Sequence, residues 1–179
     1  MILNLPNILA FLRLLMAPLL LWLLVGREGE FLQGIHESWL NYFAALVFVL
    51  ASVTDFFDGY IARMFNQITT LGKIIDPLAD KMLTLAAFLG LVVLGRADVW
   101  AIFLILSREF FITGLRVMAV GEGRDVSSSM AGKIKTVSQM IAIGFLIMDW
   151  PGGTLLLWIA VAITLFSGYE YIRDYAKGR

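Results

Sequence analysis

The chain has 179 residues, of which 60% are hydrophobic and 16% are charged, and its formal net charge at pH 7 is +0. A soluble domain is usually about 45–50% apolar and about 25% charged, so this composition indicates a membrane protein. A chain without net charge gives no indication of a nucleic acid partner. Because it has no cysteine, disulfides, thiolate metal sites and thiol catalysis are excluded.

The only histidine, His36, lies in a polar segment. We therefore do not expect a Ser/His/Asp catalytic triad. With neither a thiolate nor a second imidazole in the chain, a bound metal ion would be held by oxygen ligands.

Six apolar segments are candidates for membrane helices. The first begins MILNLPNILAFLRLLMAPLL, without the basic region and cleavage site of a signal peptide, so we expect it to be retained. A spanning helix needs about 20 mostly apolar residues. The candidates, of which the fifth is short, are 8–25, 39–57, 74–94, 99–120, 134–148 and 154–172. We predict an all-α integral membrane protein, a six-transmembrane-helix bundle in which residues 1–179 form a single domain.

The orientation follows from the distribution of Lys and Arg, which are enriched in cytoplasmic loops. One set of helix ends carries Arg63, Lys73, Lys81, Arg124, Lys133, Lys135, Arg173, Lys177 and Arg179. The other ends carry only Arg27 and Arg96 among basic residues, and they also hold Trp22, Trp39, Trp100 and Trp150. Tryptophan favours the membrane–water interface. Both termini are therefore predicted to be cytoplasmic, in a multi-pass protein of the cell membrane.

Four aspartates lie in the stretch DFFDGYIARMFNQITTLGKIIDPLAD, at Asp55, Asp58, Asp76 and Asp80. Within each pair the spacing is three or four residues, so the members of a pair share a helix face. Two neighbouring helices would then direct four carboxylates at a common point. By the predicted orientation, this point lies at the cytoplasmic boundary of the membrane.

Converging carboxylates repel one another unless they are protonated or neutralised by cations. Oxygen ligands suit hard cations such as Mg²⁺, Mn²⁺ or Ca²⁺, and a site with two such ions suits displacement at phosphorus. Gly59 and Ala62 leave room for a ligand, and Arg63 can bind phosphate oxygens. The alternative is that the acids are solvated or contact lipid headgroups, which suits one acid better than the spaced set.

The stretch matches the pattern D-x2-D-G-x2-A-R-x8-G-x3-D-x3-D at Asp55, Asp58, Gly59, Ala62, Arg63, Gly72, Asp76 and Asp80. By this pattern the chain resembles the CDP-alcohol phosphatidyltransferase family. The resemblance implies six transmembrane helices and transfer of a phosphatidyl group from CDP-diacylglycerol to an alcohol, with release of CMP.

The resemblance also implies a metal site. Asp55, Asp58 and Asp76 would hold one divalent cation, and Asp76 with Asp80 the second, with Mg²⁺ or Mn²⁺ as the expected metals. Asp80 would also act as the general base on the acceptor hydroxyl.

The CDP group is expected at the same segment, on Asp55, Asp58, Gly59, Ala62, Arg63 and Thr69. Asn7 is a further candidate for a nucleotide contact, although it could equally be the N-cap of the first helix. Arg13 could contact phosphate or pair with a buried acid.

The acceptor is predicted from basic residues further along the chain. Ionisable residues within a membrane span are rare, and they indicate function. Arg108 and Arg116, in SREFFITGLR, could flank one pocket, and Lys133 and Lys135, in GKIKTVSQ, begin the fifth span. Such charge suits an acceptor that carries its own phosphate. Alternatively, these residues mark the cytoplasmic boundary, and Arg108 forms a structural ion pair with Glu109.

The stretches NLPNILAFLR, DPLADK, SREFFITGLR and GKIKTVSQ resemble the family members whose acceptor is sn-glycerol 3-phosphate. This resemblance implies formation of phosphatidylglycerophosphate, and it implies a homodimer. The same chemistry with serine or inositol phosphate is the nearest alternative. A membrane cation carrier would also explain buried acids, but it leaves the spacing of Gly59, Ala62 and Arg63 without a purpose.

Overall fold

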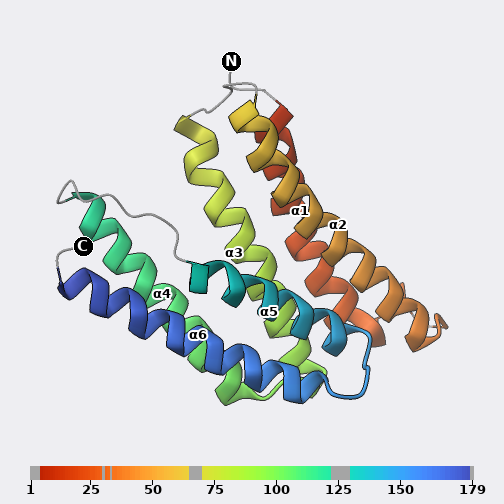
Figure 1. Ribbon diagram of the computed structural model, residues 1–179. Helices are drawn as coiled ribbons and strands as arrows, with labels where there is room; N and C mark the ends of the chain where they lie inside the picture. The colour runs from red at the N-terminus through yellow and green to blue at the C-terminus, as the bar shows by residue number, and fades with distance from the viewer. Residues whose placement is uncertain (1–4, 30, 33, 65–69, 122–129, 178–179) are drawn as a thin grey trace. The chain divides into compact units, whose positions relative to one another are not determined.

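The computed structural model describes the backbone of residues 5–29, 31–32, 34–64, 70–121 and 130–177. Within these ranges the chain forms six α-helices and one short 3-10 helix (Figure 1). They are α1 (Leu5–Val25), η1 (Gly26–Glu28), α2 (Glu37–Met64), α3 (Thr70–Val93), α4 (Val99–Gly121), α5 (Met130–Ile147) and α6 (Gly153–Ala176). The predicted all-α architecture is confirmed.

Each predicted apolar segment lies on one of these helices. The largest difference concerns α2, which continues to Met64 although its apolar segment was expected to end at residue 57. In the part of the chain that the structure describes, four helices contain a segment long and apolar enough to cross a membrane, namely α1, α2, α5 and α6. Helices α3 and α4 are of similar length but carry several ionisable residues, so their membrane-spanning role stays a prediction.

The chain forms two compact units. The first comprises Met1–Gly95 and Ile147–Asp149, and the second comprises Arg96–Leu146 and Trp150–Arg179. The aspartate stretch belongs to the first unit, and the predicted acceptor residues belong to the second. A single domain over the whole chain stays a prediction.

In the first unit, α1 packs against both α2 and α3. The buried residues of these three helices include several small ones, namely Ala10, Ala17, Ala44, Ala79 and Ala87. Small side chains let helix backbones approach closely, which is the usual way for helices to pack in a membrane. Gly90 of α3 shows such a close approach to α1, because a Cβ atom there would lie 2.6 Å from Cδ1 of Leu24.

Arg13 is fully buried between helices of the first unit. Its Nε donates a hydrogen bond to the backbone carbonyl of Ala51 on α2, with a donor–acceptor distance of 3.3 Å. A buried charge is expensive unless it is hydrogen-bonded. The arginine thus links α1 to α2 through the backbone.

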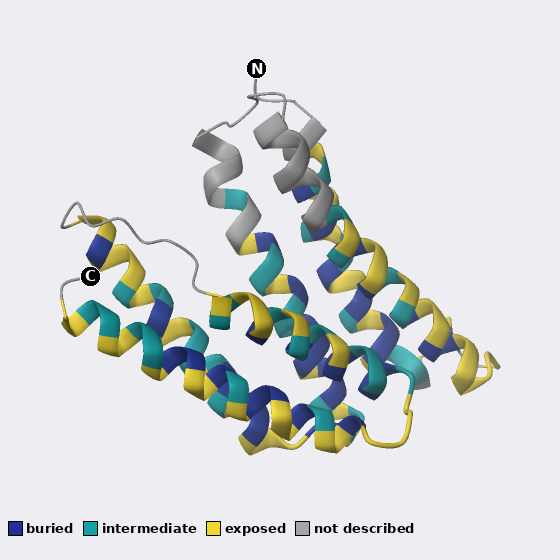
Figure 2. Cartoon of the chain, viewed as in Figure 1, coloured by how far each residue is buried: buried dark blue, intermediate teal, exposed yellow. Residues whose placement is uncertain are grey.

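In the second unit, α4 packs against α6, and buried and exposed residues alternate along α6 (Figure 2). The buried residues recur at intervals of three or four, as expected for a helix with one covered face. They are Gly153, Leu157, Ala160, Val161, Thr164, Ser167 and Gly168. Two of the buried side chains carry hydroxyl groups, which is unusual for an apolar interface.

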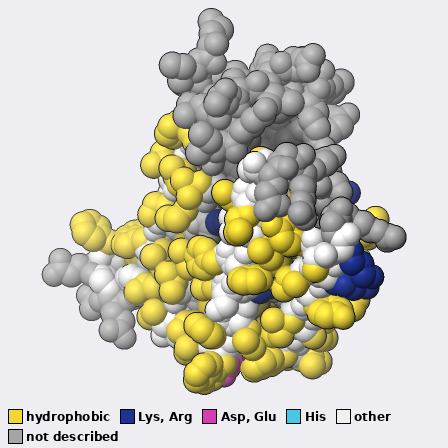
Figure 3. All heavy atoms as spheres, turned by 90° about the vertical axis from the view of Figure 1, so that its left-hand side faces the viewer, with side chains coloured by type: hydrophobic (Ala, Val, Ile, Leu, Met, Phe, Trp, Pro, Cys, Tyr) yellow, Lys and Arg dark blue, Asp and Glu magenta, His cyan; other side chains and the backbone are white. Residues whose placement is uncertain are grey.

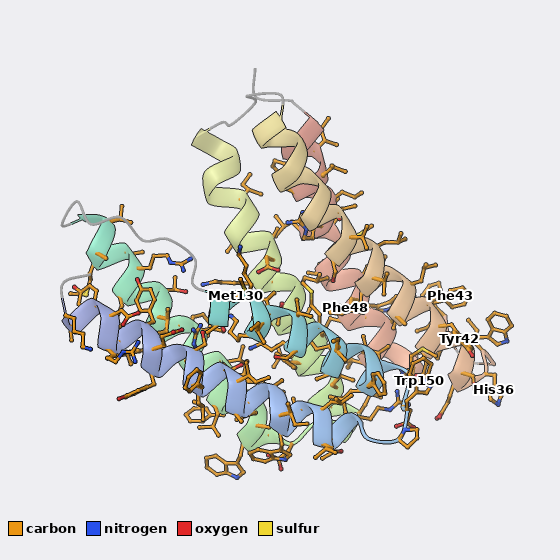
Figure 4. The ribbon with its side chains drawn as sticks, viewed as in Figure 1. His36, Tyr42, Phe43, Phe48, Met130 and Trp150 are labelled. Carbon is orange, nitrogen blue, oxygen red and sulfur yellow. The ribbon has the colours of Figure 1, made fainter. Side chains whose placement is uncertain are left out.

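The outer faces of the helices are apolar, and hydrophobic side chains cover much of the described surface in Figure 3. Trp39, which is 60% exposed, contacts the rings of Tyr42 and Phe43. Tyr42 and Phe43 lie near the beginning of α2 (Figure 4). Exposed apolar surface of this extent indicates contact with lipid rather than water. Aromatic residues at a helix end are typical of the membrane–water interface.

Candidate active site

The backbone brings the aspartate stretch to one end of the first unit. Asp55 and Asp58 lie on the last third of α2, and Asp76 and Asp80 lie on the first half of α3. The two helices are in contact, and the end of α2 lies beside the start of α3 and the start of α1 (Figure 1). Helix α2 thus continues through the first aspartate pair, and the two pairs are on neighbouring helices.

Of the four aspartate side chains, the structure describes that of Asp80. It is partly buried, and the buried Ala79 and Leu83 are close to it on the same helix. Its backbone carbonyl accepts a hydrogen bond from Oγ1 of Thr84, at 3.1 Å. Asp80 therefore lies at the edge of the packed core, where a carboxylate is partly shielded from water but still accessible.

Several predicted ligand-binding positions are described by backbone alone. Gly59, Ala62 and Arg63 belong to the last turns of α2. Asn7 lies within the first turn of α1, which begins at Leu5, so the alternative prediction that Asn7 is the N-cap is wrong. Thr69 lies outside the described residues. The side-chain contacts predicted for these residues stay predictions.

The donor set fits a hard divalent cation. The four predicted ligands are carboxylates, and the chain has no cysteine. His36 lies just before the first residue of α2, at the opposite end of this helix from the aspartates (Figure 4). At the helical rise per residue, that end of α2 is ~27 Å from Asp55. The ring Nδ1 of His36 accepts a hydrogen bond from the backbone N–H of Ser38, at 3.3 Å. Imidazole and thiolate ligands are thus remote or absent, which suits a hard cation such as Mg²⁺ or Mn²⁺.

The second unit contains a charged cluster formed by Arg108 and Glu109 of α4 and Lys135 of α5. Nη1 of Arg108 lies 3.3 Å from Oε1 of Glu109, and Nζ of Lys135 donates to the same oxygen. The side chains of Arg108 and Lys135 are each 11% exposed, and that of Glu109 is 20% exposed. Two cations thus share one carboxylate, which leaves the cluster with a positive charge.

Only part of the predicted basic group takes part in this cluster. Arg108 and Lys135 are brought together through Glu109, so the alternative prediction of an Arg108–Glu109 ion pair is confirmed. Arg116 and Lys133 are exposed, and neither forms an ion pair with another side chain that the structure describes. Their role in acceptor binding stays a prediction.

Sequence reasoning missed the contribution of α6. Oγ of Ser167 accepts a hydrogen bond from Nη2 of Arg108, at 2.9 Å. One turn earlier, Oγ1 of Thr164 accepts a hydrogen bond from Nε2 of Gln139, at 2.8 Å. The available signal was the spacing of Thr164 and Ser167, which places two hydroxyl groups on one face of an otherwise apolar helix.

Comparison with known proteins supports the family resemblance that the aspartate stretch indicated. The family model for CDP-alcohol phosphatidyltransferase matches residues 3–166. The chain belongs to the CDP-alcohol phosphatidyltransferase family. The match includes all of α1 to α5 and therefore both the aspartates and the Arg108–Glu109–Lys135 cluster.

Three similar members of the family carry the name CDP-diacylglycerol–glycerol-3-phosphate 3-phosphatidyltransferase. The protein from Bacillus subtilis (strain 168) is 39% identical, over 94% of this chain and 93% of its own length. That from Rickettsia typhi is 38% identical, over 95% of this chain and 96% of its own length. The protein from Cereibacter sphaeroides is 32% identical, over 95% of this chain and 94% of its own length. The similarity thus extends over nearly the whole of each chain.

Proposed function

We propose that this protein transfers the phosphatidyl group of CDP-diacylglycerol to sn-glycerol 3-phosphate, giving phosphatidylglycerophosphate and CMP. The observation that carries the proposal is the complete aspartate pattern on the neighbouring helices α2 and α3. Relatives at 38–39% identity over nearly their full length are named for this reaction. The protein therefore acts in the synthesis of anionic phospholipid.

Four carboxylates are proposed to hold two divalent cations, Mg²⁺ or Mn²⁺. Asp55, Asp58 and Asp76 would bind one ion, and Asp76 and Asp80 the other. Bound there, the ions supply positive charge to the pyrophosphate and to the leaving CMP. The carboxylates fix the spacing of that charge, because they project from helices rather than from loops.

The remaining residues of the aspartate stretch are proposed to bind the nucleotide. Gly59 and Ala62 leave room for the CDP group, and Arg63 and Thr69 contact it. Asn7 lies on α1, which begins at the same end of the unit (Figure 1), and it is proposed as an additional contact. Because the diacylglycerol tails stay in lipid, the nucleotide needs to be held only at the membrane boundary.

Asp80 is proposed to be the general base. It accepts the proton of the acceptor hydroxyl, whose oxygen forms a bond to the phosphorus that carries the lipid. The bond from this phosphorus to the CMP oxygen breaks, and CMP leaves with the electron pair. A carboxylate beside cations is a weak base, so positioning of the two substrates must contribute much of the acceleration.

Arg108, Arg116, Lys133 and Lys135 are proposed to bind the phosphate of the acceptor. Arginine presents planar donors that suit phosphate oxygens, and lysine provides a point charge. A neutral alcohol would not require such a group of cations. For this reason we propose an acceptor that carries a phosphate rather than serine.

The protein is proposed to be a homodimer in the cell membrane with its active site on the cytoplasmic side. The basic residues at that side attract anionic headgroups. Glycerol 3-phosphate would then enter from the cytoplasm and CDP-diacylglycerol from the bilayer.

The proposal is tested by supplying purified protein in lipid–detergent micelles with CDP-diacylglycerol, Mg²⁺ and one acceptor at a time. We expect release of CMP with sn-glycerol 3-phosphate and much less with serine, inositol phosphate or glycerol. Faster release of CMP with another acceptor would contradict the proposed acceptor but not the transfer of the phosphatidyl group. Cation flux through proteoliposomes without CMP release would support a carrier instead.

A further inference from the structure

Three polar contacts link the three helices of the second unit in pairs. Glu109 and Lys135 join α4 to α5, and Arg108 and Ser167 join α4 to α6. Gln139 and Thr164 join α5 to α6. Three of these polar residues, Gln139, Thr164 and Ser167, are no more than 5% exposed. Arg108 and Lys135, two of the four cations proposed to bind the acceptor, are therefore held by polar contacts between helices, whereas Arg116 and Lys133 are exposed.

Helix α6 holds the side chain of Arg108 at two consecutive residues, Ser167 and Gly168, which we call the Arg108 seat. The hydroxyl of Ser167 accepts from Nη2. A Cβ atom at Gly168 would lie 3.0 Å from Cγ and 3.2 Å from Nε of Arg108. The arginine stem therefore lies directly against the backbone of α6, at a distance that only glycine permits without displacement.

The seat and Glu109 together fix the plane of the guanidinium group. Nη1 donates to Glu109 and Nη2 donates to Ser167. Each of these nitrogens carries a second N–H, and these hydrogens have no partner among the described residues. Nε is buried and likewise has none there. An arginine that served packing alone would be expected to use more of its donors, since a buried unsatisfied donor is destabilising.

We propose that Ser167 and Gly168 are positioning residues that hold the Arg108 guanidinium in the orientation that binds the acceptor's phosphate. This inference rests on the proposed function. The side chain of a free arginine has much rotational entropy to lose when it binds an anion. The seat removes that cost before the acceptor arrives, so its effect is on acceptor affinity. Both residues lie just beyond the family match, which ends at residue 166.

The experiment compares Ser167→Ala and Gly168→Ala with wild type by separate titrations of sn-glycerol 3-phosphate and CDP-diacylglycerol. Ser167→Ala removes the acceptor of the Nη2 hydrogen bond, and Gly168→Ala displaces the stem. We expect the KM for sn-glycerol 3-phosphate to rise roughly tenfold in each variant, the magnitude of one charge-assisted hydrogen bond. The KM for CDP-diacylglycerol stays within twofold of wild type.

Gly153→Ala is the matched control. It adds the same methyl group to the same helix, where the Cβ atom would meet Leu146 at 2.9 Å instead of Arg108. It therefore perturbs packing without touching the seat, and the ratio of the two KM values should stay at the wild-type value.

Two results would overturn the inference. The first is an unchanged KM for sn-glycerol 3-phosphate in folded Ser167→Ala. If Gly168→Ala does not fold, the result for Ser167→Ala is sufficient by itself. The second is an equal rise in both KM values in the seat variants and in the control, as a structural role requires. A wild-type protein without turnover on sn-glycerol 3-phosphate would instead overturn the proposed function, and this inference with it.

Discussion

At the scale of single residues, the central question is how an apolar chain accommodates four carboxylates in one short stretch. A charged group near the bilayer centre costs about 2.5–3.5 kcal/mol by insertion measurements. The cost is lower where the group meets water or cations, and Asp80 lies at the edge of the packed core rather than within it. The side chain of this aspartate is thus partly shielded by protein but still accessible to a ligand.

We predict that Asp80→Asn lowers kcat by at least about 10²-fold, because the amide cannot accept the proton of the acceptor hydroxyl and is a poorer metal ligand. The readout is CMP release at saturating substrates. The matched control is Asp98→Asn. Oδ1 of Asp98 accepts the backbone N–H groups of Trp100 and Ala101 at the start of α4, at 2.9 and 3.0 Å. An amide oxygen can do the same, so activity should not change.

A second prediction concerns the exposed cations of the acceptor group. Arg116→Ala and Lys133→Ala should each raise the KM for sn-glycerol 3-phosphate, by roughly threefold to tenfold for the loss of one exposed charged contact. The KM for CDP-diacylglycerol serves as the internal reference. An unchanged acceptor KM in both variants would restrict the acceptor site to Arg108 and Lys135.

At the scale of helices, small residues let the backbone of one helix pack directly against a large buried side chain of its neighbour. In the first unit the contact of Gly90 with Leu24 is the clearest example. Helices in lipid associate through van der Waals contact rather than through the hydrophobic effect. A methyl group added where two helices pack this closely should therefore destabilise the protein.

Gly90→Ala is predicted to destabilise the protein by about 1–3 kcal/mol, the usual effect of overpacking. Its Cβ atom would lie 2.6 Å from Cδ1 and 2.7 Å from Cβ of Leu24. Gly114→Ala on α4 is the control, because no atom lies within 4 Å of its added methyl group. Thermal unfolding in detergent should show a lower Tm for the first variant only. Equal Tm values would contradict the α1–α3 contact.

The helices could be predicted from apolar run length, since a span needs a minimum length of apolar sequence. The polar stretch at 55–64 continues α2, although composition alone would end the apolar segment earlier. Contacts such as that of Arg108 with Ser167, which are 59 residues apart, could not be predicted, because they depend on how α4 and α6 are rotated about their axes. The aspartate pattern could be recognised in the sequence because the spacing of its residues is local.

At the scale of the whole molecule, orientation in the membrane decides which substrates reach the site. The chain has no cysteine, so single cysteines can be introduced without background. Ser38 precedes the apolar part of α2 and Lys177 follows α6, and both are exposed. We predict that an impermeant maleimide labels Ser38→Cys on intact cells and labels Lys177→Cys only after lysis. The reverse result would place the aspartate stretch outside the cell.

The proposed reaction is a cation-dependent transfer of the phosphatidyl group to glycerol 3-phosphate. It is tested most directly by incubating the purified protein with CDP-diacylglycerol and ¹⁴C-labelled sn-glycerol 3-phosphate, with Mg²⁺ or with excess EDTA. We predict that label enters the lipid phase in amounts equal to the CMP released, that EDTA stops both, and that added Mg²⁺ or Mn²⁺ restores both. Label that stays in the aqueous phase while CMP forms, or transfer that continues in EDTA, would contradict this reaction.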